Sequence, residues 1–257
     1  MIRVLARRRR PLVILALLGG AALGCTKDEP KRATITVAAA SSLTGVMEEV
    51  AALWGERSPV QVRCTFSATS TLVRQIERGA PCDVLLSANR FWVEYLESMD
   101  LVAEADSFLL ALNQLVVVAS PELGAASHAA AELPAGRWAL GNPEHVPAGV
   151  YAKAALEQSQ RWEEIEDRVV PAPSARAALR LVERGEVEFG IVYETDLLGS
   201  DRAVGVPGLL SLGTSVEVVG SPLRSAGPEA REFSRWLQSA EVAEVFRRYG
   251  FGMPEAR

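Results

Sequence analysis

Two spacings of apolar residues alternate along the chain. Short continuous runs, such as residues 115–119 and 189–193, are typical of strands buried on both faces. Between the runs, apolar residues recur three or four positions apart, as expected of helices with one buried face. The alternation predicts an α/β fold with a largely parallel sheet. Strands are expected at residues 34–40, 60–66, 83–87, 115–119, 138–141, 189–193 and 216–219, and helices at residues 46–54, 72–78, 91–96, 150–158, 175–184, 229–237 and 242–249.

Two of these strands run directly into a helix through small hydroxyl residues. Ser41 and Ser42 follow the first strand, and Thr69, Ser70 and Thr71 follow the second. The first N–H groups of a helix have no partner within the helix and lie at the positive end of its dipole, so each junction can bind an anion. Two such junctions could hold one anion together. The alternative is that Ser42 and Ser70 are ordinary N-caps.

A short repeat relates two distant parts of the chain. Residues 72–79 end in Glu-Arg-Gly before a strand, and residues 179–185 end in Glu-Arg-Gly before another strand. The repeat falls on matching helix–turn–strand units. It therefore predicts two similar α/β lobes, each offering helix N-termini to a shared cleft.

The first 25 residues have the composition of a secretory signal. Five arginines precede an apolar run at residues 11–18 that is too short to span a bilayer comfortably. Residues 22–25, Ala-Leu-Gly-Cys, resemble a bacterial lipobox, in which the cysteine is lipidated. We expect a lipoprotein-type signal peptide in residues 1–25, a lipid anchor on Cys25 and a charged tether in residues 26–33. Plain cleavage nearby is the alternative.

Charge argues against a nucleic-acid partner. Five of the 27 basic residues lie in residues 1–25, so the rest of the chain has 22 basic and 32 acidic residues and a net charge of −10. A chain of this charge offers no basic stripe for nucleic acid. An anion site would have to work through local dipoles, against the overall field.

Cysteine usage gives no metal site. Cys64 and Cys82 lack metal-ligand spacing, and the two histidines, His128 and His145, lie far from them in the sequence. In a doubly wound sheet the first strand would separate the two cysteines, so we expect reduced, partly buried thiols. His145 is expected to be a structural hydrogen-bonding residue.

Five motifs, in order, resemble the molybdate-binding proteins of bacterial molybdate ABC importers. They occupy residues 36–44, 66–72, 75–83, 141–153 and 190–193, and residues 247–251 resemble the family's C-terminal ending. The Pro-Glu-His-Val-Pro-Ala-Gly loop at residues 143–149 is the most specific part. The resemblance implies the type II periplasmic-binding-protein fold, with two α/β lobes and an oxyanion between them. Lobe one would comprise residues 34–112 and 213–257, and lobe two residues 113–212.

The resemblance also implies five ligand contacts. Ser42 and Ser70 would each give a backbone N–H and a hydroxyl, Ala148 and Ala175 would give backbone N–H groups, and Tyr193 would give its phenol. Molybdenum would enter only as molybdate, without direct metal ligands. Ala175 stands where the family often has valine, which would alter packing more than hydrogen bonding.

A site of N–H and O–H donors suits a fully deprotonated tetrahedral dianion. Phosphate keeps a proton near neutral pH and would need an acceptor. None of the five implied contacts is an arginine, which is the usual partner of a carboxylate ligand. The resemblance, not the pattern, favours molybdate and tungstate over sulfate. We expect a non-enzymatic, monomeric, extracytoplasmic component that delivers its anion to an ABC permease and needs no cofactor. The alternatives are a binding protein for another oxyanion and a hydrolase using Ser42 or Ser70, although neither serine has a G-x-S-x-G pattern.

Overall fold

The computed structural model describes residues 33–123, 133–209, 213 and 215–254. The predicted signal peptide, Cys25 and nearly all of the tether lie outside these residues. Among the described residues, no helix is both long and apolar enough to cross a membrane.

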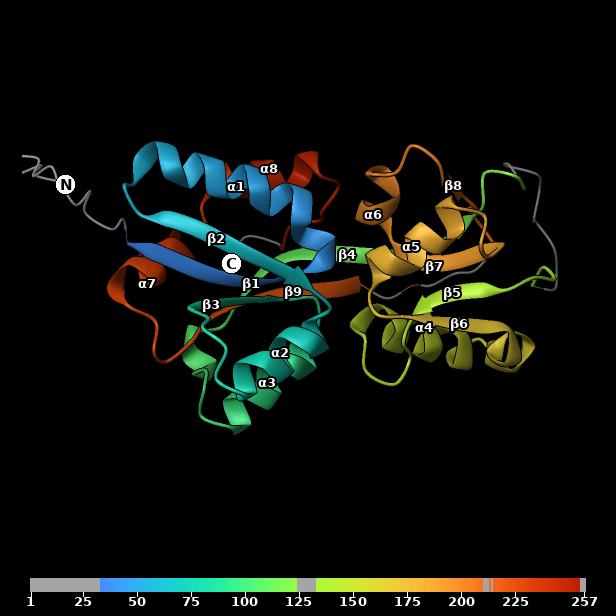
Figure 1. Ribbon diagram of the computed structural model, residues 1–257, viewed down its shortest axis with the longest axis horizontal. Helices are drawn as coiled ribbons and strands as arrows, with labels where there is room; N and C mark the ends of the chain where they lie inside the picture. The colour runs from blue at the N-terminus through green and yellow to red at the C-terminus, as the bar shows by residue number, and fades with distance from the viewer. Residues whose placement is uncertain (1–32, 124–132, 210–212, 214, 255–257) are drawn as a thin grey trace, which may run out of the picture. The chain divides into compact units, whose positions relative to one another are not determined.

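The N-terminal residues and the C-terminal residues build one part of the sheet, here called region one. In it β1 lies between β2 and β3 and runs parallel to both, and β9 pairs antiparallel with β3 and with the first half of β4. In Figure 1, α1 and α8 lie on one side of these strands and α2 and α3 on the other. The elements are β1 (Thr34–Ala40), η1 (Ser41–Leu43), α1 (Thr44–Arg57), β2 (Gln61–Ser67), α2 (Thr69–Glu77), β3 (Val84–Ser87), α3 (Arg90–Ser98), η2 (Glu104–Asp106), β4 (Phe108–Ala119), β9 (Ser215–Pro222), α7 (Pro228–Trp236) and α8 (Ala240–Arg248).

The middle of the chain builds the rest of the sheet, here called region two. In it β5 lies between β7 and β6 and runs parallel to both, whereas β7 pairs antiparallel with the second half of β4. Trp138 on β5 stacks on Phe189 of β7 with ring centroids 4.9 Å apart, which fixes these two strands against each other. The elements are β5 (Trp138–Gly141), α4 (Pro147–Gln158), η3 (Trp162–Glu164), η4 (Glu166–Arg168), β6 (Val169–Ala172), α5 (Ala175–Glu183), β7 (Phe189–Tyr193), α6 (Glu194–Leu198) and β8 (Val204–Gly205), which pairs with β4.

The long strand β4 belongs to both regions. Its residues up to Gln114 pair with β9, and from Leu115 onward they pair with β7. The chain therefore crosses from region one to region two inside a strand and returns at the start of β9. The predicted lobe boundaries at residues 112 and 212 stay a prediction.

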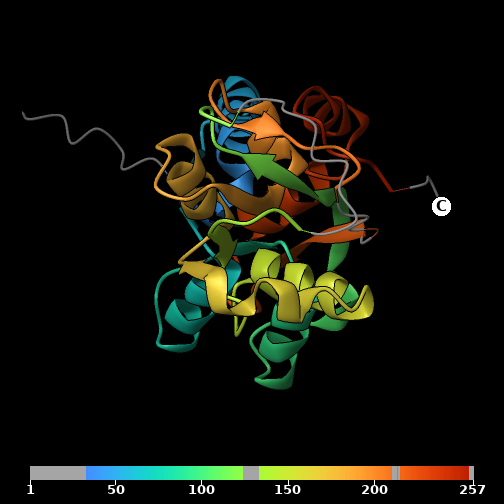
Figure 2. The ribbon, with the colours of Figure 1, turned by 90° about the vertical axis from the view of Figure 1, so that its right-hand side faces the viewer.

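The two ends of region one are held together by aromatic packing. Trp54 of α1 meets Phe233 and Trp236 of α7, in each case with ring centroids 5.2 Å apart. Helix α8 packs along α1 as well, and Figure 2 shows these two helices, from opposite ends of the chain, side by side. The helices that follow β9 thus complete the region that begins with β1.

The predicted α/β fold is confirmed, with differences in detail. The sheet is mixed, because β4 and β9 run antiparallel to their neighbours. The prediction missed β6, in which Pro171 is tolerated because β6 lies at the edge of the sheet. Helix α4 begins at Pro147, three residues earlier than expected, with proline at its first position.

The prediction of free thiols agrees with the structure, and the repeated residues lie at the ends of two helices. Both Cys64 and Cys82 are free, and β1 lies between β2, which carries Cys64, and β3, which follows Cys82. Burial raises the pKa of Cys64 to about 11 and that of Cys82 to about 12.

The repeated Glu-Arg-Gly ends two helices in the same way. Gly79 follows the end of α2 with a φ of +87°, and Gly185 follows the end of α5 with a φ of +67°.

Candidate functional site

A small cavity lies where helix N-termini of region one and region two meet. Its volume is about 10 Å³, and it is bordered by the starts of η1, α2, α4 and α5 and by the end of β7. Helix α5 of region two lies directly against η1 of region one. Four of the five predicted contacts, Ser42, Ala148, Ala175 and Tyr193, line this cavity. The lining residues are Ala40, Ser41, Ser42, Ala68, Thr69, Ala88, Val146, Pro147, Ala148, Ser174, Ala175 and Tyr193.

Two buried hydroxyl groups of this lining have no hydrogen-bond partner within the described part of the chain. They are the Ser42 Oγ and the Tyr193 phenol oxygen. A buried polar group without a partner costs about 1–3 kcal/mol, so a folded protein rarely keeps two of them in one place without a use. Burial raises the pKa of Tyr193 well above its ordinary value, so the phenol keeps its proton and can donate. Both groups are available to an acceptor placed in the cavity.

Backbone N–H groups converge on the same cavity from three helices. Pro147 has no N–H, so Ala148 carries the first N–H group of α4. In α5 the Ser174 side chain caps the helix by accepting from the Ala177 N–H at 3.1 Å, and the N–H of Ala175 keeps no helical partner. With the start of α2, three positive dipole ends surround the cavity.

The N-cap alternative for the two serines is wrong. Helix α2 begins after Ala68, and η1 begins after Ala40, neither with a side-chain cap, so Ser42 and Ser70 lie inside the first turns of their helices. Their hydroxyl groups are therefore free for other contacts.

Ser70, the fifth predicted residue, is placed differently from the other four. It is fully buried and does not line the cavity, and its Oγ lies 3.1 Å from His145 Nδ1. The adjacent Thr69 lines the cavity instead. Its Oγ1 accepts the N–H of Ala88 at 3.1 Å, which leaves its own hydroxyl hydrogen to be donated. The sequence did not single out Thr69, because the start of α2 carries hydroxyl residues at several successive positions.

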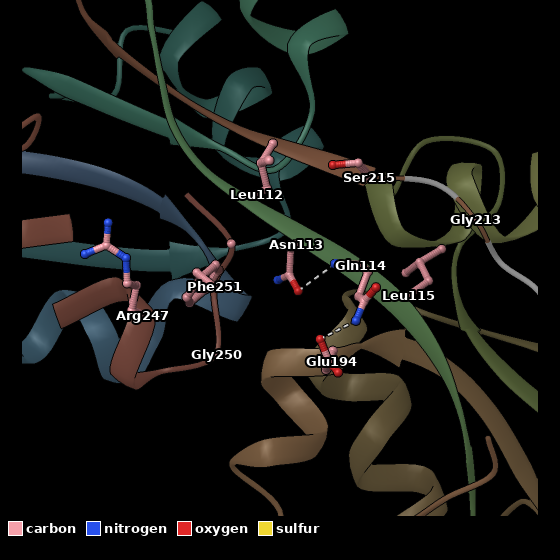
Figure 3. A pocket seen from close by; sticks show the side chains of 11 residues that line it. Leu112, Asn113, Gln114, Leu115, Glu194, Gly213, Ser215, Arg247, Gly250 and Phe251 are labelled. Carbon is pink, nitrogen blue, oxygen red and sulfur yellow. Dashed lines mark hydrogen bonds between the residues drawn. The ribbon is translucent and has the colours of Figure 1, made fainter. Parts of the chain in front are cut away.

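A much larger cavity, of about 650 Å³, lies beside the crossing point of β4 (Figure 3). The side chains of Asn113, Gln114, Glu194 and Arg247 in its lining already have partners. Asn113 Nδ2 donates to Thr195 Oγ1 at 2.9 Å, and Gln114 Nε2 donates to Glu194 Oε2 at 2.5 Å, the pair that Figure 3 shows pointing at each other. Arg247 lies across the cavity from them and pairs with Glu244 at 3.1 Å. Size favours this cavity as a binding site, but the unpaired buried hydroxyls favour the small one.

An ion pair with a buried carboxylate supports one wall of the small cavity. Asp196 follows Tyr193 by three residues, and its fully buried carboxylate lies 3.4 Å from Arg176 Nε, next to Ala175. Burial raises the pKa of Asp196 to about 6, and the nearby Arg176 opposes this shift. The contact ties the start of α5 to α6, and so fixes Ala175 relative to the end of β7.

Two α/β regions joined by crossing strands, with a small donor-lined cavity between helix N-termini, define the class of extracytoplasmic solute-binding proteins. A family model described as bacterial extracellular solute-binding protein matches residues 35–252. The chain belongs to this family, whose members are binding components of transport systems rather than enzymes.

Individual relatives agree with this assignment. The chain is 36% identical to the molybdate-binding protein ModA of Escherichia coli, over 92% of this chain and 97% of that protein. It is 34% identical to ModA of Haemophilus influenzae, over 85% and 90% of the two chains. The solved periplasmic molybdate-binding protein of Azotobacter vinelandii superposes with a TM-score of 0.74 at 19% identity, over 86% of this chain and all of that one. These matches confirm the predicted periplasmic-binding-protein fold.

Proposed function

We propose that this protein is the substrate-binding component of an ABC importer for molybdate, and for tungstate, and that it binds the oxyanion in the small cavity. The observation that carries the proposal is the pair of buried, unpartnered hydroxyls, Ser42 Oγ and the Tyr193 phenol, among three helix N-termini. The similarity to two ModA proteins supports the choice of anion.

The chemistry of the lining supports a dianion. Its side chains offer hydroxyl donors and apolar walls, and no carboxylate or guanidinium group is among the lining residues. A tetrahedral oxyanion without protons can accept from every one of these donors. Phosphate near neutral pH carries a proton that would face no acceptor, which costs binding energy.

The size of the cavity supports binding by closure. About 10 Å³ is room for little more than one water-sized sphere, so the walls must move apart before an oxyanion enters. The crossing in β4 and the start of β9 are where such a hinge motion would take place. Molybdate and sulfate differ mainly in size, and the preference for molybdate rests on the similarity to the ModA proteins.

The site gives little support to the hydrolase alternative. Ser70 and His145 form a serine–histidine contact, but the Ser70 side chain is fully buried and lies outside the cavity lining. Ser42 lines the cavity but has no base bonded to its hydroxyl within the described residues.

We further propose that the protein is anchored by a lipid on Cys25, that it is a monomer, and that its partner is a membrane permease.

Calorimetric titration of the anion-free protein tests the proposal. Molybdate and tungstate should bind, sulfate should bind weakly, and phosphate should give no heat. Equal binding of sulfate and molybdate would change the assignment to a general oxyanion or sulfate carrier. Absence of binding by all four anions would overturn the function.

A further inference from the structure

The contact between Ser70 and His145 joins the two regions directly beside the small cavity. Ser70 lies in the first turn of α2, in region one, next to the cavity-lining Thr69. His145 precedes α4, in region two, and stands two residues before Pro147. The 3.1 Å contact between Ser70 Oγ and His145 Nδ1 therefore links the helix starts on opposite sides of the cavity.

His145 is held firmly to region two. The carbonyl of Asn142 accepts from the N–H groups of His145 at 3.2 Å and of Val146 at 2.9 Å, which closes a tight turn. At Gly149, a Cβ atom would lie 1.8 Å from the carbonyl oxygen of Gly141, so the first turn of α4 is pressed against the end of β5. His145 must consequently move together with α4 and β5.

Ser70 is held just as firmly to region one. The neighbouring Thr69 accepts the N–H of Ala88, which ties the start of α2 to the end of β3. Ser70 itself has no exposed surface. When the regions separate, neither partner can follow the other, so the bond must break.

We infer that the Ser70–His145 hydrogen bond is the contact that holds the cleft closed over the anion. His145 is a positioning residue that acts through Ser70, and neither side chain touches the anion. Ser70 thereby changes from the predicted ligand contact to one half of an interregion latch, and the anion's hydroxyl donor from α2 is Thr69. The inference rests on the proposed function.

The two roles of Ser70 predict different losses of affinity. A typical hydrogen bond within the protein that favours closure is worth about 2- to 13-fold in Kd. A hydroxyl that donates directly to a dianion is worth about 13-fold or more. Loss of a latch also appears mainly as faster release of the anion, because closure governs residence time.

A double-mutant cycle separates the two roles. The variants are Ser70→Ala, His145→Ala and the double change, with His145→Asn as a conservative variant whose amide can reach the same position. Ser234→Ala is the matched control, because Ser234 is a buried serine of α7 whose Oγ donates to the Ala230 carbonyl, away from the cavity. Molybdate Kd is measured by calorimetry, and the release rate by tryptophan fluorescence in a stopped-flow instrument.

We expect each single alanine variant to raise Kd about 2- to 13-fold, mainly through faster release, and the double variant to be no worse than either single one. His145→Asn should recover most of the loss, and Ser234→Ala should bind as the wild type does. The inference would be overturned by additive losses of affinity, or by a large loss in Ser70→Ala with wild-type binding in His145→Ala. Either result would mean that Ser70 contacts the anion directly.

Failure of the proposed function gives a different result. If the wild type binds sulfate rather than molybdate, the function is reassigned and the same cycle is run with sulfate. If it binds no oxyanion, the function fails, and small-angle scattering of the ligand-free proteins decides about the latch. Expansion in both single variants, without further expansion in the double variant, would support it, whereas unchanged scattering would overturn it.

Discussion

Tyr193→Phe should have opposite effects on stability and on binding. The phenol is buried, keeps its proton and has no partner among the described residues, so in the anion-free protein it is a buried donor left unsatisfied. Removing it should raise the free energy of unfolding by about 1 kcal/mol, the lower end of the usual range, because opening of the cleft hydrates the group part of the time. For a chain of this size, 1 kcal/mol corresponds to about 2–4 °C in Tm.

With molybdate bound, the same change removes a hydrogen bond to a charged acceptor. Such a bond is worth about 1.5–3 kcal/mol, which corresponds to a 13- to 160-fold rise in Kd. Scanning calorimetry should therefore show Tyr193→Phe above the wild type without the anion. At molybdate concentrations well above both Kd values it should fall below the wild type, because the loss of about 1.5–3 kcal/mol then exceeds the gain of about 1 kcal/mol. The variant thus gains stability in the anion-free protein and loses affinity for the anion, as expected when a binding-site group is removed.

The control is Tyr249→Phe, which removes a partly exposed phenol at the end of α8, outside the lining of the small cavity. It should leave Kd unchanged. The reasoning would be refuted if Tyr193→Phe lowered Tm without the anion and left Kd at the wild-type value. That result would mean that the phenol is a structural group of the core.

Three further predictions concern the same molecule. Ala148→Val should abolish molybdate binding in calorimetry, because the added methyl groups fill a cavity of about 10 Å³. Ala177→Val, in α5 but outside the cavity lining, should bind normally. Normal binding by Ala148→Val would place the anion elsewhere. Asp196→Asn should stabilise the protein at pH 7 and make no difference near pH 4. The pKa of Asp196 in the folded state, about 6, lies above its ordinary value of 3.8, so the wild type loses stability as pH rises through this window. Urea unfolding measures the free energy at both pH values, and an equal difference between variant and wild type at the two would contradict the prediction. Cys64 and Cys82 should both react with an alkylating agent after unfolding without reductant, and mass spectrometry showing a disulfide between them would contradict the order of strands β2, β1 and β3.

The order of the elements could be predicted from the sequence because each element has a local signal. Continuous apolar runs marked β3, β5 and β7, and the repeated Glu-Arg-Gly marked the ends of α2 and α5. Strand β6 could not be predicted, because Pro171 argues against a strand unless its place at the sheet edge is known. The length of β4 was also hidden, because Asn113 and Gln114 interrupt its apolar run at the point where it passes from one region to the other.

The sequence also identified most of the residues that border the small cavity. Local sequence identifies the helix starts that meet at the cavity, and four of the five residues that the family resemblance implied do line it. The choice between Thr69 and Ser70 depends on the bond from Ala88 to Thr69 and on His145, which is 75 residues away from Ser70. Such long-range contacts set the rotation of α2 about its axis, and no local pattern encodes them.

The position of β9 has a consequence for the order in which the chain can fold. Its partners are β3, where Ser87 faces Val219, and the first half of β4. Strand β9 therefore fills the centre of region one, whose other strands precede it by a long stretch of chain. Region two needs no strand beyond β8 and can complete its pairing locally, whereas region one must close a long loop and wait for its last strand. Pulse-labelled hydrogen exchange during refolding should therefore detect protection of β5 and β7 before that of β3. Until β9 pairs with it, β3 has an exposed edge and is the strand most open to mispairing with another chain.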